Sequence, residues 1–508
     1  MNLLTTITTL LITALMLASS AAAQDDSKHG IFDNSLDVGN TATPGSSVFD
    51  EQSERYVLTS PKNAPTADEA AFQYIWKAIQ GDFILRAHLE FVGSENDGKR
   101  SIGWAVRNGL EPEAASVNAL LFDDGKVVSD YREERGGSYQ TIESDYKSPN
   151  VIQLSRLNGR FTMSVAMAGE PFQHIDIGEI QLKKEVFAGL FIHSEDNSSA
   201  DAAIFHNVRI TKPAPEDFEQ YDEYLGSRLE VIDVETGVRD VLYETEHSIQ
   251  APNWTPDGEK LIYNSNGFLY NYHFDNGQIT PLNTGFATQN NNDHVVTFDG
   301  TQIAISHHNP EDDNHSTIYM LPIEGSDNPK QVTPSGVGPS YLHGVSPDNQ
   351  TVIYTGLRKG QYDIYAADVN TMEETQLTDT PGLDDGSEYS PDGETIYFNS
   401  NRTGTMQIWK MDADGSNQTQ LTFDKSTHDW FPHISPDGKW IVFLSYGLDV
   451  DSGAHPFYKQ VTLQVMPAEG GEPRIIAYLY GGQGTINVPS WSPDSKKVAF
   501  VSNSGRFR

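Results

Sequence analysis

The chain has 508 residues, with 71 acidic against 34 basic side chains, a net charge of −37 at pH 7 and no cysteine. Its length predicts two or three domains, and its hydrophobic content of 37% is sufficient for packed cores. The acidity excludes nucleic acid as a partner, because phosphate binding requires a basic surface, and the lack of cysteine excludes disulfides, thiolate metal sites and a cysteine nucleophile.

The first 23 residues have the pattern of a secretory signal. Residues 3–17 are apolar apart from threonines, although no Lys or Arg precedes them, and the small Ala21 and Ala23 stand just before Gln24. The run is shorter than the roughly 20 residues that a membrane-spanning helix needs. We therefore expect cleavage after Ala23 and a periplasmic or secreted protein without a membrane span.

Residues 24–215 consist of short segments in which apolar and polar residues alternate, such as 83–89, 161–166 and 203–210. A period of two without a sustained helical period predicts an antiparallel sandwich. The segments 72–76, 81–83, 103–107, 191–194 and 205–208 resemble the concanavalin-A-like jelly-roll modules of bacterial carbohydrate-active proteins. Trp104, together with Trp76 and Arg107, is a candidate for stacking on a sugar, but tryptophans in such strands are more often part of the core.

A polar connector with Pro213 and Pro215 ends this half, and the sequence repeats from Arg228 onward. The recurring turn elements are 255–258 (TPDG), 297–300 (TFDG), 346–349 (SPDN), 390–393 (SPDG), 435–438 (SPDG) and 492–495 (SPDS). Their starts are 42, 49, 44, 45 and 57 residues apart, and a period in the forties predicts four-stranded propeller blades.

The last turn is followed by one strand only, residues 497–501. The segments 228–233 and 239–242 are therefore expected to complete the final blade, which closes a ring of six blades over residues 226–508 and removes its open edges. With companion segments such as 399–404 and 411–415, the repeat resembles TolB-type six-bladed β-propellers. This resemblance implies a fold more than a function, because propellers include binding proteins, peptidases and lyases.

Titratable residues precede four of the turns, and we expect the strand that ends at each turn to be the innermost of its blade. These residues are Asp293, His294, His343, Asp384, Asp385, Glu388, His428, Asp429 and His433. A single strand histidine is more often structural, but ring closure would gather all these groups around one axis. The pattern predicts a functional site in the channel, with a purely structural or solvent-filled channel as the alternative.

The residue types suggest roles for the individual side chains. His343, Glu388 and His433 are the candidate ligands of a divalent metal, Mn²⁺, Zn²⁺ or Ca²⁺. His428 or His294 is the candidate base. Arg358 and Arg402 could pair with a carboxylate or sulfate, or could simply tie neighbouring blades together. Asn253, Asp385 and Asn487 are candidates for substrate binding.

The arrangement is similar in kind to oligogalacturonate lyases, related propellers that hold a divalent metal on channel histidines. The sequence therefore favours a carbohydrate-active enzyme, a metal-assisted lyase or hydrolase that acts on oligosaccharides from polysaccharides. The alternative is a non-catalytic TolB-like protein that binds a protein or a glycan.

Overall fold

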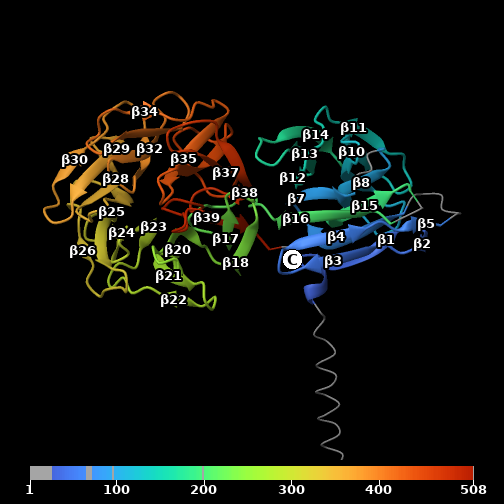
Figure 1. Ribbon diagram of the computed structural model, residues 1–508, viewed down its shortest axis with the longest axis horizontal. Coiled ribbons are helices and arrows are strands. Elements are labelled where there is room, and N and C mark those ends of the chain that lie inside the picture. Colours follow the sequence, from blue (N-terminus) through green and yellow to red (C-terminus); the bar gives the residue numbers. More distant parts are fainter. Residues whose placement is uncertain (1–25, 65–70, 94–96, 197–199, 507–508) are drawn as a thin grey trace, which may run out of the picture. The chain divides into compact units, whose positions relative to one another are not determined.

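The computed structural model describes residues 26–64, 71–93, 97–196 and 200–506, so the expected signal segment lies outside the described residues. The chain divides into two compact units, one formed by residues up to Ile210 and the other by Thr211–Arg506 together with Gly169–Pro171. Within the described ranges the only helical element is the short 3-10 turn η1 (Asp26–His29), and no helix is long and apolar enough to cross a membrane. The predicted all-β fold class is confirmed (Figure 1).

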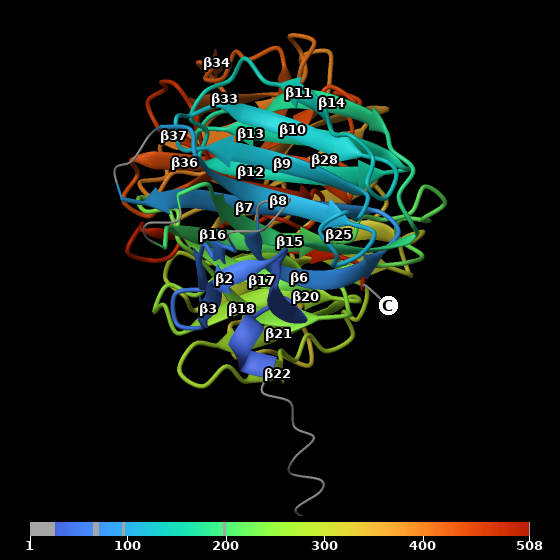
Figure 2. The same cartoon turned by 90° about the vertical axis from the view of Figure 1, so that its right-hand side faces the viewer.

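The first unit contains two seven-stranded sheets (Figure 2). In spatial order, the first sheet comprises β1 (Asn34–Val38), β6 (Phe72–Gln80), β15 (Glu185–Ser194), β8 (Arg100–Arg107), β9 (Ser116–Phe122), β10 (Val127–Arg132) and β11 (Gln140–Glu143). The second sheet comprises β14 (Gln173–Glu179), β13 (Arg160–Ala166), β12 (Val151–Leu157), β7 (Phe83–Val92), β16 (Ala202–Thr211), β4 (Arg55–Thr59) and β3 (Ser46–Asp50). β2 (Thr41–Thr43) and β5 (Lys62–Asn63) form a separate pair.

The inward-facing residues of both sheets form one apolar core, in which Ile75 and Leu190 of the first sheet join Leu85 and Phe205 of the second. This is the packing expected of a sandwich with period-two strands. Trp104 lies in the same core and is 0% exposed. The proposed sugar contact of Trp104 is therefore wrong, because a ring that is completely buried cannot stack on a ligand.

The second unit is the predicted six-bladed propeller. Its four-stranded blades are, from the inside outward, β19 (Gln250–Trp254), β20 (Lys260–Ser265), β21 (Phe268–His273) and β22 (Ile279–Pro281); β23 (Asn290–Val296), β24 (Gln302–Asn309), β25 (His315–Pro322) and β26 (Lys330–Gln331); β27 (Ser340–Val345), β28 (Thr351–Arg358), β29 (Gln361–Asp368) and β30 (Glu374–Gln376); β31 (Asp384–Tyr389), β32 (Thr395–Ser400), β33 (Gln407–Asp412) and β34 (Thr419–Gln420); β35 (Thr427–Ile434), β36 (Trp440–Gly447), β37 (Lys459–Pro467) and β38 (Arg474–Gly481). The sixth sheet has the order β18 (Arg239–Thr245), β17 (Gly226–Asp233) and β39 (Lys497–Ser504), and a bridge from Trp491 to Val498 stands in for its inner strand.

The recurring turns are fixed by side chains within each element. In the fourth blade, Ser390 Oγ donates to Asp392 Oδ1 over 2.5 Å and accepts from the backbone N–H of Thr395, while Asp392 Oδ1 also accepts from the N–H of Glu394. Gly393 has a φ of 75°, which favours glycine, and a Cβ there would come 3.3 Å from Pro347 of the preceding turn. The turns therefore combine local capping with contacts between neighbouring blades.

The ring closes because the first and last strands pair antiparallel, from Gly226 opposite Ser504 to Asp233 opposite Lys497. In Figure 1 the red β39 lies beside the green β17. A buried ion pair supports this seam: Arg239 of β18 donates to both carboxylate oxygens of Glu230 of β17 over 2.8 Å, and Ser502 of β39 donates to the same carboxylate. The closure predicted from the sequence is confirmed.

Glu230→Ala should lower the free energy of unfolding of the propeller by about 3–5 kcal/mol, because it leaves the buried guanidinium of Arg239 without its counter-charge. Glu244→Ala, which removes an exposed partner of Arg228 on the same sheet, should cost at most about 1 kcal/mol. Urea unfolding of the full chain measures both values. Equal losses in the two variants would contradict the role of the buried pair in closure.

Candidate functional site

A pocket of about 1080 Å³ lies inside the propeller. All six blades contribute lining residues, and those of the sixth blade come from the segment just before β39. Its amide-bearing lining residues are Gln250, Asn264, Asn266, Gln289, Asn290, Asn291, Asn292, Gln483 and Asn487. Its aromatic lining residues are Tyr221, Tyr224, Tyr341, Tyr362, Phe431 and Phe457. Its titratable lining residues, besides the tyrosines, are Asp293, His308, His343, Asp385 and His455. We refer to this cavity as the central pocket.

A register shift recurs at the same place in all five inner strands. It lies between Gln250 and Asn253, Asn290 and His294, Leu342 and Gly344, Asp385 and Glu388, and Trp430 and His433. Such an irregularity re-aims the side chains that follow it. The inner-strand residues that line the central pocket, such as Gln250, Asp385 and Phe431, all lie before or within the shift. Asn253, His294, Glu388 and His433 lie after it and do not line the pocket.

Asp385 is the centre of the polar contacts in the pocket. Its Oδ1 lies 2.9 Å from His343 Nε2 and accepts hydrogen bonds from Thr355 Oγ1 and from the backbone N–H of Gly386. Burial alone would raise the pKa of Asp385, but the positive charge and hydrogen bond of His343 outweigh it and hold this pKa at about 2. Burial conversely lowers the pKa of His343, yet the carboxylate of Asp385 raises it overall. Each residue therefore stabilises the charged form of the other.

Asp293 in the same pocket has a raised pKa, in contrast to the lowered pKa of Asp385. Burial raises its pKa to about 7; the positive charge of His343 opposes this rise, and the negative charge of Asp385 adds to it. Two carboxyl groups of one pocket therefore differ by several pH units in their titration. Such a split is the pattern by which enzymes keep one carboxylic acid protonated beside an ionised one.

His455 directs a ring nitrogen toward Asp385. Its Nδ1 lies 2.5 Å from Gln483 Oε1, an oxygen that also accepts from Asn487 Nδ2. Because that oxygen can only accept, Nδ1 carries the proton in neutral His455 and the lone pair is on Nε2, 3.8 Å from Asp385 Oδ2. Burial lowers the pKa of His455, so the ring is neutral at pH 7. Asp293, His343, Asp385 and His455 together are the acid–base cluster.

The three expected metal ligands do not form one ligand set, which corrects that prediction. His433 Nδ1 lies 2.5 Å from Glu388 Oε2, and its Nε2 bonds to the backbone carbonyl of Ile486. Both nitrogens are thus engaged, while His343 lies in the pocket with Asp385. Among the described residues, no group of three or more His, Asp or Glu side chains is placed to hold a metal ion.

The two expected bases also have structural partners. His294 is 0% exposed, its two ring nitrogens lie 3.1 Å from the carbonyls of Asn292 and Ile262, and burial lowers its pKa to about 4. His428 is buried, and its Nδ1 accepts from the N–H of Met406. Neither lines the central pocket, so neither reaches a ligand bound there.

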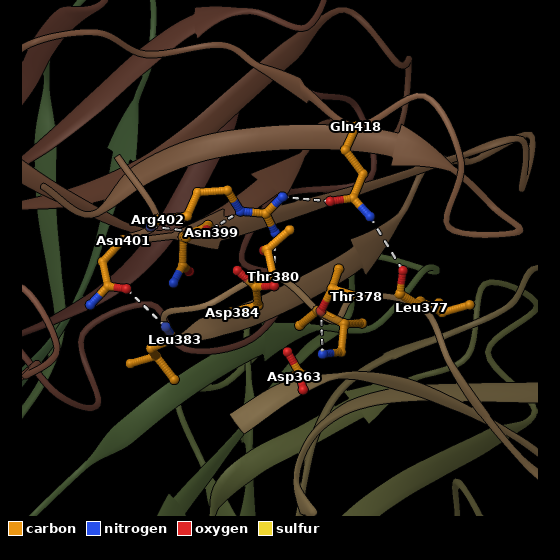
Figure 3. A network of polar contacts seen from close by, with 12 residues as sticks. Asp363, Leu377, Thr378, Thr380, Leu383, Asp384, Asn399, Asn401, Arg402 and Gln418 are labelled. Atoms are coloured by element: carbon orange, nitrogen blue, oxygen red, sulfur yellow. Dashed lines mark hydrogen bonds and ion pairs between the residues drawn. The ribbon is translucent and has the colours of Figure 1, made fainter. Parts of the chain in front are cut away.

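The two candidate arginines bind within the protein. Arg402 donates to Asp384 Oδ2 over 2.7 Å and to Gln418 Oε1 over 2.5 Å (Figure 3). Its guanidinium lies over the ring of Trp409. Arg358 pairs with Glu374 at 2.5 Å. Both arginines bind partners of their own blade, so the alternative role as ties between neighbouring blades does not describe them. Neither lines the central pocket, and the expected contact with a substrate anion is wrong.

Of the candidate substrate-binding residues, Asp385 and Asn487 line the central pocket. Asn253 does not, because it donates to the carbonyl of Pro489 and accepts from the N–H of Val296, which joins it to both neighbouring blades. The residue that sequence reasoning missed is His455, between β36 and β37. The interval of 57 residues between the last two turns was a signal of extra chain in this blade.

The PD40 family, the TolB beta propeller domain, matches residues 312–452. The uncharacterized protein Atu1656 of Agrobacterium fabrum is 44% identical over 277 residues, which are 54% of this chain and 92% of that protein. This chain belongs to the TolB β-propeller family. A solved structure from Agrobacterium tumefaciens described as a TolB is 42% identical, with a TM-score of 0.53 over 56% of this chain and all of that one.

An oligogalacturonate lyase of Vibrio parahaemolyticus has a solved structure with weaker similarity to this chain. It is 13% identical, with a TM-score of 0.36 over 55% of this chain and 97% of that one. A likeness at this level carries no activity over to the TolB-like chain described here.

Asp293→Asn should stabilise the protein increasingly as the pH rises. The carboxyl of Asp293 titrates at about 7 in the folded protein and near 3.8 in the unfolded chain, so the folded state binds this proton more tightly. Folding stability therefore falls between about pH 4 and 7 in the wild type, and Asn removes this loss. Relative to pH 4, the advantage of the variant should reach at most about 4 kcal/mol at pH 8.

Urea unfolding at pH 4, 6 and 8 measures the difference. The matched control is Asp257→Asn: hydrogen bonds from Thr255 and Glu259 overcome a partial burial and lower the pKa of Asp257. The stability that this change removes is already present above about pH 4, so its cost should differ little between pH 4 and 8. A pH-independent difference for Asp293→Asn would show that this carboxyl is not held protonated by its surroundings.

Proposed function

We propose that the central pocket is the active site of a glycoside hydrolase that acts on neutral oligosaccharides. The observation that carries the proposal is the acid–base cluster, in which two groups face one pocket: Asp293, a carboxyl whose pKa burial raises to about 7, and His455, an imidazole whose pKa burial lowers. These shifts favour the protonation states that a general acid and a general base need before the reaction begins.

The lining residues support a neutral sugar as the ligand. Side-chain amides and tyrosine hydroxyls can both donate to and accept from sugar hydroxyls, and aromatic rings suit the apolar faces of pyranoses. No Lys or Arg among the described residues lines the pocket, so a uronate or sulfate would lack a permanently charged partner. Elimination from uronates needs their carboxylate neutralised, and the pocket therefore favours hydrolysis over lyase chemistry.

The reaction follows from the two groups. Asp293 donates its proton to the glycosidic oxygen as the bond to the anomeric carbon breaks, and His455 Nε2 removes a proton from the water that attacks this carbon. Asp385 stabilises the resulting imidazolium at 3.8 Å, while His343 keeps Asp385 ionised. Water is added across the bond, with no step assigned to a metal because the residues expected to bind one do not fit it.

Export from the cytoplasm is part of the proposal, since polysaccharide fragments are found outside the cell, and it depends on the expected cleavage after Ala23. A TolB-like protein that binds a glycan or a protein without turnover is the competing function.

Asp293→Asn and His455→Gln should each lower kcat on a cleaved neutral oligosaccharide by about 100-fold or more, while binding of that oligosaccharide is retained. The control His247→Gln changes an exposed histidine outside the pocket and should leave kcat unchanged. Product release from a panel of neutral oligosaccharides, measured with and without chelator, provides the test. Binding without turnover in the wild type would establish the competing function, and activity that needs a metal would refute a metal-free mechanism.

The pH dependence of kcat/KM should be bell-shaped, with its optimum on the acid side of pH 7. The rate rises as His455 loses its proton, at a pKa that burial keeps below the usual 6.5, and falls as Asp293 loses its own at about 7. Initial rates between pH 4 and 9 measure the two limbs. Activity that remains constant from pH 6 to 9 would exclude Asp293 as the acid.

A further inference from the structure

Three aromatic residues have a left-handed backbone: Tyr221 and Phe431, which line the central pocket, and Tyr458, which follows the lining residue Phe457. The φ angles are 75° for Tyr221, 55° for Phe431 and 61° for Tyr458. This conformation is unfavourable for bulky residues, at a cost on the order of 1–3 kcal/mol each, and persists only where the surroundings impose it. Such residues concentrate at functional sites, so we expect this group of residues to have a functional role.

The segment before β17, residues 213–225, is fastened to the chain between β36 and β37. The side-chain amide of Gln220 donates to the carbonyl of Phe457 and accepts from the N–H of the same residue. The N–H of Leu225 donates to Tyr458 Oη over 3.1 Å, and the ring of Phe218 meets the ring of Tyr458 edge-on at 5.3 Å. These contacts hold the chain on both sides of Tyr221 and the side chain of Tyr458.

The fastened segment presents two tyrosine rings to the pocket. The ring centroids of Tyr221 and Tyr224 lie 5.3 Å and 6.1 Å from that of Phe457, with interplanar angles of 75° and 89°. All three residues line the pocket, yet Tyr221 remains 63% exposed. A large ring held in a strained backbone while most of its surface meets solvent contributes little to the core, so its surface is available to a ligand.

We propose that Tyr221, Tyr224 and Phe457 form an aromatic subsite that stacks on a sugar ring bound beyond the acid–base cluster. The subsite makes residues 213–225 a determinant of specificity, because only an oligosaccharide long enough to extend past the reacting unit reaches these rings. The ligand class rests on the proposed function, whereas the position of the subsite rests on the geometry of the three rings.

Tyr221→Gly removes the ring and accepts the φ of 75°, so the variant should fold without strain. Its affinity for a hexasaccharide should fall at least about tenfold, with little change for the disaccharide. Tyr221→Phe keeps the stacking surface and should bind both ligands nearly as the wild type does. The control Phe423→Ala removes a ring that is 69% exposed outside the pocket and should change neither affinity.

Calorimetric titration of the full chain with di- to hexasaccharides of β-1,4-glucan, β-1,4-xylan and β-1,3-glucan provides the measurement. Equal losses for short and long ligands, or no loss in Tyr221→Gly, would overturn the subsite. Absence of binding to the wild type in all three series would overturn it together with the proposed ligand class. Length-dependent binding that requires Tyr221 but leads to no turnover would support the subsite and refute only the catalytic proposal.

Discussion

The hydrogen-bonded ladder between β17 and β39 is the constraint on which the propeller depends. Every other blade is built from consecutive strands, but the sixth sheet joins strands from the two ends of the unit, and the pair Glu230–Arg239 is buried at this seam. Closure completes the sixth blade and directs all inner strands toward one axis. The central pocket exists because these strands converge.

Recurring local chemistry made this architecture predictable. Each turn carries its own hydroxyl and carboxylate cap, as Ser390 and Asp392 show, so its sequence determines its structure with little help from the rest of the chain. The single strand left after the last turn then required the first strands to complete the ring. Residues 1–23 remain a prediction, as does the relation of the first unit to jelly-roll modules.

The candidate site was predictable in its region but not in its individual residues. His343, Asp385 and Asn487 line the central pocket, whereas His433, Glu388 and Asn253 connect blades. The register shift in each inner strand separates these groups, since a slip in register reverses the face on which the later residues lie. Gly386, with a φ of 63°, marks the shift in β31, but Phe431 has a similar φ in β35 and no sequence rule announces it. His455 and Tyr221 lie outside the repeat altogether.

Two histidine–carboxylate pairs of the propeller differ in whether they can act on a ligand in the central pocket. Glu388–His433 is closed by the carbonyl of Ile486, so neither ring nitrogen is open to a ligand. Asp385–His343 borders the pocket and sets the charge that its neighbours Asp293 and His455 experience.

The seam between β17 and β39 also has a consequence for biosynthesis. During translation β17 emerges early and waits, with one edge unpaired, until almost the whole propeller has left the ribosome. A nascent chain in this condition is open to strand exchange with other chains, so productive folding of this protein depends on shielding that edge until the final strand arrives.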